Sequence, residues 1–96
     1  MAKRIFEKTH IPAIATTVCV GVQSALRYVI VNTTANGTVT IYDAATDATC
    51  STTNCVGILK ASIVEGTYRY DVIMSAGITV VSLGNSDLTV VYERLS

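Results

Sequence analysis

The dipeptide Asn36-Gly37 constrains this chain more than any other feature, because it separates two runs of β-branched and aromatic residues within 25–43. Asn and Gly both tolerate the positive φ angles of a type I′ turn, so the pair is the strongest short-range signal for a β-hairpin. We therefore expect residues 25–43 to form a hairpin that serves as the framework of the fold.

The first of these runs alternates as a strand does when one face is buried. In a regular strand, successive side chains point to opposite faces. One face would then carry Leu26, Tyr28 and Ile30, and the other Arg27, Val29 and Val31. After the turn, Val39 and Ile41 alternate with threonine and tyrosine, which predicts a second strand with one apolar face.

Further segments have the composition of short strands: 13–20, 56–64, 66–74, 78–83 and 88–95. In 66–74, one face carries Tyr68, Tyr70, Val72 and Met74. The polar stretch 44–54 shows no regular alternation of polar and apolar residues, so we expect a loop there, which could include a short helix. Turn signals recur throughout, and this pattern predicts an all-β fold, a single antiparallel β-sandwich of about seven short strands.

Residues 1–12 form a separate N-terminal arm in this interpretation, and 13–96 form the β-sandwich domain. The arm mixes basic Lys3 and Arg4 with apolar Ile5 and Phe6, and it ends at a proline that disfavours a helix. We expect these four side chains to contact a neighbouring subunit and not their own domain. The alternative is a frayed terminus exposed to solvent.

The composition excludes several classes of protein. Half of the residues are hydrophobic, only 15% are charged, and seven basic side chains balance seven acidic ones. Without a net positive field, binding to nucleic acid or to an anionic membrane is not expected. A surface with so few charges exposes much apolar and hydroxyl-bearing area, which favours burial in an oligomer or on a larger assembly.

No residue pattern indicates catalysis or a cofactor, so we expect neither. His10 lies in the arm, where a general base would be poorly held, and no nucleophile elbow, metal-ligand cluster or phosphate loop is present. Cys50 and Cys55 bracket a short segment, and either a disulfide between them or two thiols fits that spacing. Cys19 is expected to be a small core residue.

The five tyrosines allow two interpretations. Tyr68 and Tyr70 could stack on a carbohydrate or peptide ligand, which would make the chain a binding module. The simpler interpretation is that tyrosine suits half-buried strand positions, because its ring is apolar and its hydroxyl is polar. Exposure of the tyrosine-bearing face distinguishes the two.

Three stretches within residues 25–93 form a recognisable series: LRYVIVNT, then GTVTIYDAAT, then GTYRYDVIMSAGITVVSLGNSDLTVVYE after a polar loop. In this series the chain resembles a group of small structural proteins of tailed bacteriophages. The resemblance covers about two thirds of the chain and includes no catalytic residue. The arm and the loop between Cys50 and Cys55 are not part of it.

The resemblance implies a virion component made in the host cytoplasm, such as a head decoration or cement protein that bridges capsid subunits. Its partners would be the major capsid protein or other virion proteins, and it would act as a homo-oligomer, with a trimer favoured. A tail, neck or fibre-associated β domain is the alternative within virions.

Overall fold

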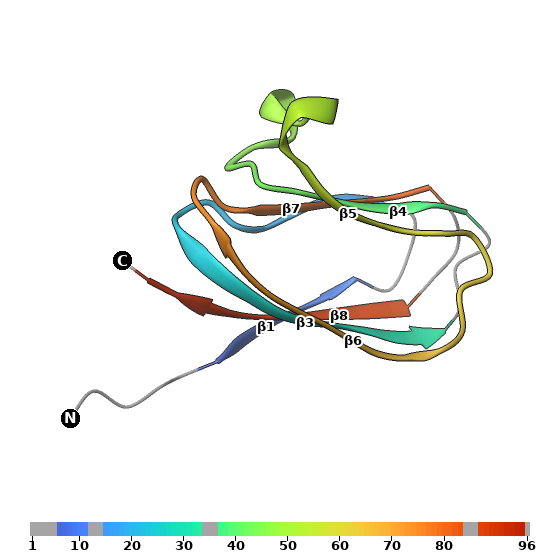
Figure 1. The fold of residues 1–96 in the computed structure, drawn as a ribbon. Helices are drawn as coiled ribbons and strands as arrows, with labels where there is room; N and C mark the ends of the chain where they lie inside the picture. The colour runs from blue at the N-terminus through green and yellow to red at the C-terminus, as the bar shows by residue number, and fades with distance from the viewer. Residues whose placement is uncertain (1–5, 12–14, 34–36, 84–86, 96) are drawn as a thin grey trace.

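The computed structural model describes residues 6–11, 15–33, 37–83 and 87–95. Within these ranges the chain forms two four-stranded antiparallel sheets that face each other (Figure 1). In spatial order, sheet A consists of β1 (Glu7–Ile11), β8 (Asp87–Arg94), β3 (Ser24–Thr33) and β6 (Gly66–Met74). Sheet B consists of β2 (Ala15–Val20), β7 (Ile78–Ser82), β4 (Val39–Tyr42) and β5 (Cys55–Leu59). The predicted all-β sandwich is confirmed.

Consecutive strands along the described chain lie in different sheets, with one exception. Only β4 and β5 are neighbours both in sequence and in the same sheet. Most strands therefore form backbone hydrogen bonds with strands that are distant in sequence. Strands that follow one another in sequence mostly lie in opposite sheets and face each other across the core.

The predicted hairpin at 25–43 is wrong. β3 pairs with β8 on one side and with β6 on the other, whereas β4 pairs with β7 and β5. Val29 of β3 and Ile41 of β4 still share the core, but they meet across the sandwich and not within one sheet. Both edges of β3 are taken by other strands, so the turn signal does not produce a hairpin. The intended turn residue Asn36 lies outside the described residues.

A β-bulge changes the predicted faces of β3. The pairing register shifts between Leu26 and Tyr28 on both sides of the strand, so Leu26 and Val29 are both fully buried although they are three positions apart. Tyr28 is only partly buried, and the expected set of Leu26, Tyr28 and Ile30 on one face is therefore wrong. A bulge adds a residue to one strand and thereby moves the following side chains to the other face.

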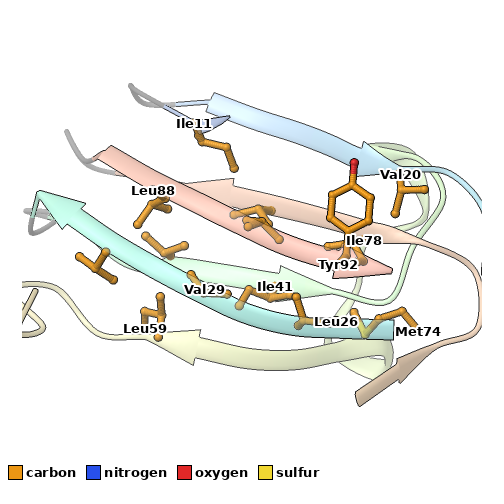
Figure 2. Packing of buried hydrophobic residues seen from close by; sticks show 14 residues of the cluster. Ile11, Val20, Leu26, Val29, Ile41, Leu59, Met74, Ile78, Leu88 and Tyr92 are labelled. Carbon is orange, nitrogen blue, oxygen red and sulfur yellow. The ribbon is translucent and has the colours of Figure 1, made fainter. Parts of the chain in front are cut away.

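The core lies between the two sheets, and both contribute to it (Figure 2). Its buried members are Ile11, Val20, Leu26, Val29, Val31, Val39, Ile41, Leu59, Met74, Ile78, Val80, Leu88, Val90 and Tyr92. The regular alternation of Leu88, Val90 and Tyr92 in β8 confirms the strand predicted at 88–95.

The prediction that residues 1–12 form an arm separate from the domain is also wrong for part of this segment. Residues 7–11 form β1, which pairs with β8 of the same chain from Glu7 to Ile11. Ile11 is 1% exposed and belongs to the core, because the alternation of the strand turns it inward. Of the four residues expected to contact a neighbour, Lys3, Arg4 and Ile5 lie outside the described residues.

The loop between β4 and β5 folds over the outer face of sheet B (Figure 1). It contains two short 3-10 turns, η1 (Asp47–Thr49) and η2 (Thr52–Asn54), in agreement with the predicted loop. The Asp43 carboxylate accepts hydrogen bonds from the backbone amides of Ser75 (3.0 Å) and Ala76 (2.8 Å), and thereby ties the loop to the turn between β6 and β7. The Thr79 hydroxyl donates to the Ala44 carbonyl at 3.0 Å, which explains why this outward-facing side chain is buried.

The strand predicted at 56–64 is shorter than expected. β5 ends at Leu59, and residues 61 and 62 form a turn in which Ser62 has a φ of 64°. Local turn geometry thus stops a segment whose composition would have allowed a longer strand.

Candidate functional site

Charge is divided unequally between the two sheets. Among the described strands, every charged residue lies in sheet A and none lies in sheet B. The charged strand residues are Glu7, Lys8, Arg27, Arg69, Asp71, Asp87, Glu93 and Arg94. Acidic and basic members are equal in number, so sheet A carries many charges but no net charge.

One end of sheet A carries an ion-pair network centred on Arg27. Its guanidinium group contacts Glu93 at 2.7 Å and Asp71 at 3.1 Å, and Arg69 also pairs with Asp71. Hydrogen bonds from Arg69 and then Arg27 lower the pKa of Asp71, because they stabilise its ionised form. The Phe6 ring lies 5.8 Å from the guanidinium carbon of Arg27, a cation–π distance, and Phe6 is 49% exposed.

A second polar cluster joins three strands of sheet A. His10 Nε2 of β1 lies 2.6 Å from Asp87 Oδ1 of β8. The Asn32 side-chain amide of β3 donates to the same oxygen at 3.0 Å and to the Thr89 hydroxyl at 3.1 Å. These contacts, Asn32 first and His10 second, lower the pKa of Asp87. With a His10 side chain that is 57% exposed, the cluster is a surface link and not an enclosed site.

The strands of sheet B present an uncharged and partly apolar outer face, part of which lies under the loop between β4 and β5. Strand pairing aligns Thr16, Val81, Thr40 and Ile58 in one row across all four strands. We call these four residues the sheet B row. At one end of the row Ile58 is 58% exposed, and Val18, on the same face of β2, is 44% exposed. Desolvating this face costs less than desolvating the network on sheet A, because no charge has to leave water.

The edge strands follow the same division. β1 and β6, at the edges of sheet A, carry several charged residues, and β6 is distorted opposite Arg27, where Asp71 has a φ of 52°. β2 and β5, at the edges of sheet B, carry no charge. Charges and bulges on edge strands both discourage pairing with other chains. The pairing of β2 and of β5 also shifts register, so the edges of the two sheets differ in charge and not in the presence of bulges.

The tyrosines of β6 do not form an exposed stacking platform. Tyr68 and Tyr70 both pack against the core, and the Tyr68 hydroxyl donates to the Val64 carbonyl. The Tyr70 hydroxyl lies so close to Gly57 of β5 that a Cβ there would be 2.7 Å from it. Burial raises the pKa of Tyr70. The interpretation of these tyrosines as half-buried strand residues is confirmed.

The three cysteines occur as thiols in the structure, with no disulfide between Cys50 and Cys55. Cys19 packs against the core, as predicted, and burial raises the pKa of its thiol to about 11. Cys50 and Cys55 lie on either side of η2 and are only partly buried.

No group of three or more His, Cys, Asp or Glu side chains that could hold a metal ion occurs in the described ranges. Within the same ranges, no helix has the length and apolarity to cross a membrane. Comparison with protein-family models, with curated proteins and with solved structures found no match.

The feature that sequence reasoning missed is the division of charge between the sheets. The low charge of segments such as 15–20 and 55–59 is visible in the sequence. That these segments join 39–42 and 78–82 in one sheet is decided by strand pairing. The most distinctive surface of the molecule is therefore the outer face of sheet B.

Proposed function

We propose that this chain is a structural protein of a bacteriophage virion, of the head decoration kind, that acts through surface contacts and not through catalysis. The single observation that supports this most is the absence of charge from all four described strands of sheet B. An uncharged sheet with exposed Ile58 and Val18 is suited to burial against another protein. The resemblance of residues 25–93 to phage structural proteins supplies the biological setting.

In this proposal, sheet B binds the capsid or a neighbouring copy, and sheet A faces solvent. Burial of apolar area by the sheet B row and backbone hydrogen bonds at the edge strands would hold neighbouring capsid subunits together. The balanced charges of sheet A would keep the exposed side hydrated. A homo-oligomer, with a trimer favoured, belongs to the same proposal.

The alternative of a carbohydrate-binding or peptide-binding module receives less support. Its stacking residues would be Tyr68 and Tyr70, and both rings pack against the core. A catalytic role likewise receives little support from the exposed pair of His10 and Asp87.

Immunogold electron microscopy tests the proposal directly. Antibodies raised against the purified chain are applied to virions of the phage whose genome encodes it. We expect regularly spaced label on the head. Label confined to the tail or neck would overturn the decoration role in favour of the alternative within virions. Virions that carry no label, and whose mass spectra contain no peptide of the chain, would overturn the virion role.

A further inference from the structure

The loop between β4 and β5 brings together the backbone on either side of two cysteines. Cys50 directly precedes Ser51, and Cys55 directly follows Asn54. The Asn54 amide donates to the Ser51 carbonyl at 3.2 Å, and the Ser51 amide donates to the Asn54 side-chain oxygen at 2.8 Å. Ser51 and Asn54 therefore close a tight turn, and each carries a cysteine as its outer neighbour.

The Asn54 side chain extends this closure to the far side of Cys50. Its amide nitrogen donates to the Thr49 carbonyl at 2.7 Å, so one side chain binds the backbone both before and after Cys50. Cys55 is held immediately next to that side chain by the peptide bond. A disulfide needs Cα atoms roughly 4.4–6.8 Å apart, so two cysteines can be joined only where the chain between them turns back. In the reduced structure the Cys50 thiol donates to the Thr46 carbonyl at 3.7 Å, a contact that has to break before the bond can form.

We propose that Cys50 and Cys55 are a redox-modification site, at which a small-molecule disulfide converts the two thiols into one intramolecular disulfide. The thiolate of one cysteine attacks the added disulfide, forms a mixed disulfide and releases one small thiol. The second thiolate attacks the mixed disulfide and releases the other small thiol. Two protein thiols are oxidised, one small disulfide is reduced to two thiols, and the protein's two protons pass to solvent or to the released thiolates.

This bond would act on the loop that covers Thr79 on the outer face of sheet B. The Asp43 amide donates to the Asn54 carbonyl at 2.8 Å, so the turn is already fixed to the end of β4. The Asp43 carboxylate also accepts hydrogen bonds from the backbone amides of residues 75 and 76, and the Ala44 carbonyl accepts one from the Thr79 hydroxyl. A ring closed between Cys50 and Cys55 would therefore restrain the base of the whole loop. The inference stands whether or not the chain is a virion protein.

Cys19 provides an internal control. Its thiol is buried, and the resulting pKa of about 11 leaves almost no thiolate near neutral pH. The attacking species in exchange is the thiolate, so Cys19 is expected to remain reduced while Cys50 and Cys55 react.

The experiment treats the reduced full chain with oxidised glutathione at mildly alkaline pH, then denatures and alkylates it for mass spectrometry. We expect a product that is lighter by two hydrogens before alkylation and that takes up one alkyl group, on Cys19. Cys50→Ser and Cys55→Ser should each form a glutathione adduct on the remaining cysteine of the pair, without an internal bond. Cys19→Ala should still form the bond.

Thermal melting adds a second readout. The oxidised protein is expected to melt ~5 °C higher than the reduced protein, because the closed ring restricts the unfolded chain. The double variant Cys50→Ser/Cys55→Ser should show no such difference. A stable glutathione adduct on the unsubstituted pair, a bond that includes Cys19, or two thiols that stay reduced would each overturn the proposal.

Discussion

Sheets A and B have similar strand architecture but opposite surface chemistry. Sheet A carries every charged residue of the described strands. Most of these residues are paired, in the clusters around Arg27 and Asp87 and in the ion pair between Arg94 and Glu7. Sheet B carries none and presents threonine, valine and isoleucine to the outside. A sheet with paired charges is well suited to permanent contact with water. An uncharged sheet loses little when it is covered, so the comparison separates a solvent face from a candidate contact face.

The two sheets also depend on each other at specific junctions. The chain passes from sheet A to sheet B at the turn between β6 and β7, where Gly77 lies close to Val20 and Ala44. Tyr92 of sheet A donates a hydrogen bond to the Cys19 carbonyl of sheet B at 3.0 Å. Predictions at these junctions test how the sheets are joined, and predictions on the faces test how they differ.

The largest effect is expected at the junction residue Gly77. A Cβ there would lie 2.4 Å from the Val20 carbonyl oxygen, and the φ of 153° is one that other residues rarely adopt. Gly77→Ala should lower the free energy of unfolding by ~3 kcal/mol or more, measured by urea denaturation.

Gly66→Ala is the matched control for this variant. Gly66 has nearly the same φ, 152°, but no atom lies within 4 Å of its added Cβ. Gly66→Ala should lower the free energy of unfolding by only about 1 kcal/mol, because alanine is strained at this φ but its Cβ meets no other atom. Equal losses in the two variants would show that the close approach of Gly77 to the Val20 and Ala44 carbonyl oxygens is unimportant.

The next effect concerns the contact face. Ile58→Lys places a charge in the sheet B row on an edge strand, where lysine opposes strand pairing and burial. We expect at least about a tenfold loss of affinity for virions or for other copies of the chain, which corresponds to ~1.4 kcal/mol. Co-sedimentation with virions and analytical ultracentrifugation measure these affinities.

Ile73→Lys is its matched control, because Ile73 is 56% exposed on the outer face of sheet A and Ile58 is 58% exposed on sheet B. This control should bind as the unsubstituted chain does. Weaker binding by Ile73→Lys than by Ile58→Lys would reverse the assignment of the two faces.

A smaller effect is expected from the hydroxyl that links the sheets. Tyr92→Phe removes the hydrogen bond to the Cys19 carbonyl and the contact with the Thr9 hydroxyl at 3.2 Å. The loss should be about 1 kcal/mol of unfolding free energy, because a partly buried carbonyl loses its partner.

Tyr42→Phe, on the outer face of sheet B, removes a hydroxyl without a hydrogen bond to any described residue, and it should leave stability unchanged. Thermal denaturation of both variants provides the measurement. A loss for Tyr42→Phe as large as that for Tyr92→Phe would contradict the special role of the inter-sheet link.

The smallest effect is the pH dependence that sheet A confers. Its contacts lower the pKa values of Asp71 and Asp87, so both carboxylates favour the folded state when they are ionised. This contribution is fully present above the unfolded pKa of about 4 and is lost as the pH falls through the lower folded values. The melting temperature of the unsubstituted chain should therefore fall by a few degrees on acidification.

The double variant Asp71→Asn/Asp87→Asn should melt at a temperature that changes less over the same acidic range. The strands of sheet B contain no carboxylate, so they add nothing to this pH dependence. If the melting temperature of the double variant falls with pH as steeply as that of the unsubstituted chain, the acid sensitivity arises elsewhere in the chain.

The disagreement over residues 1–12 shows where local reasoning stopped. Mixed charge and a following proline indicated an arm outside the domain. The structure uses Ile11 in the core and pairs His10 with Asp87, a residue near the other end of the chain. Nothing within residues 1–12 indicates that β8 has an edge free to pair with this segment, because that depends on how the rest of the chain folds.

The sequence alone determined the positions of most strands, the inward faces of β4 and β6, and the polar loop between β4 and β5. These features depend on residues one to three positions apart, through alternation and turn chemistry, so they are visible in a linear pattern. The tertiary structure decided that β3 and β4 lie in different sheets, that β3 is bulged beside Arg27, and that the uncharged strands form one sheet. Those outcomes depend on which strand edges meet across long separations in sequence, because an edge can accept any strand whose apolar side chains fit the shared core.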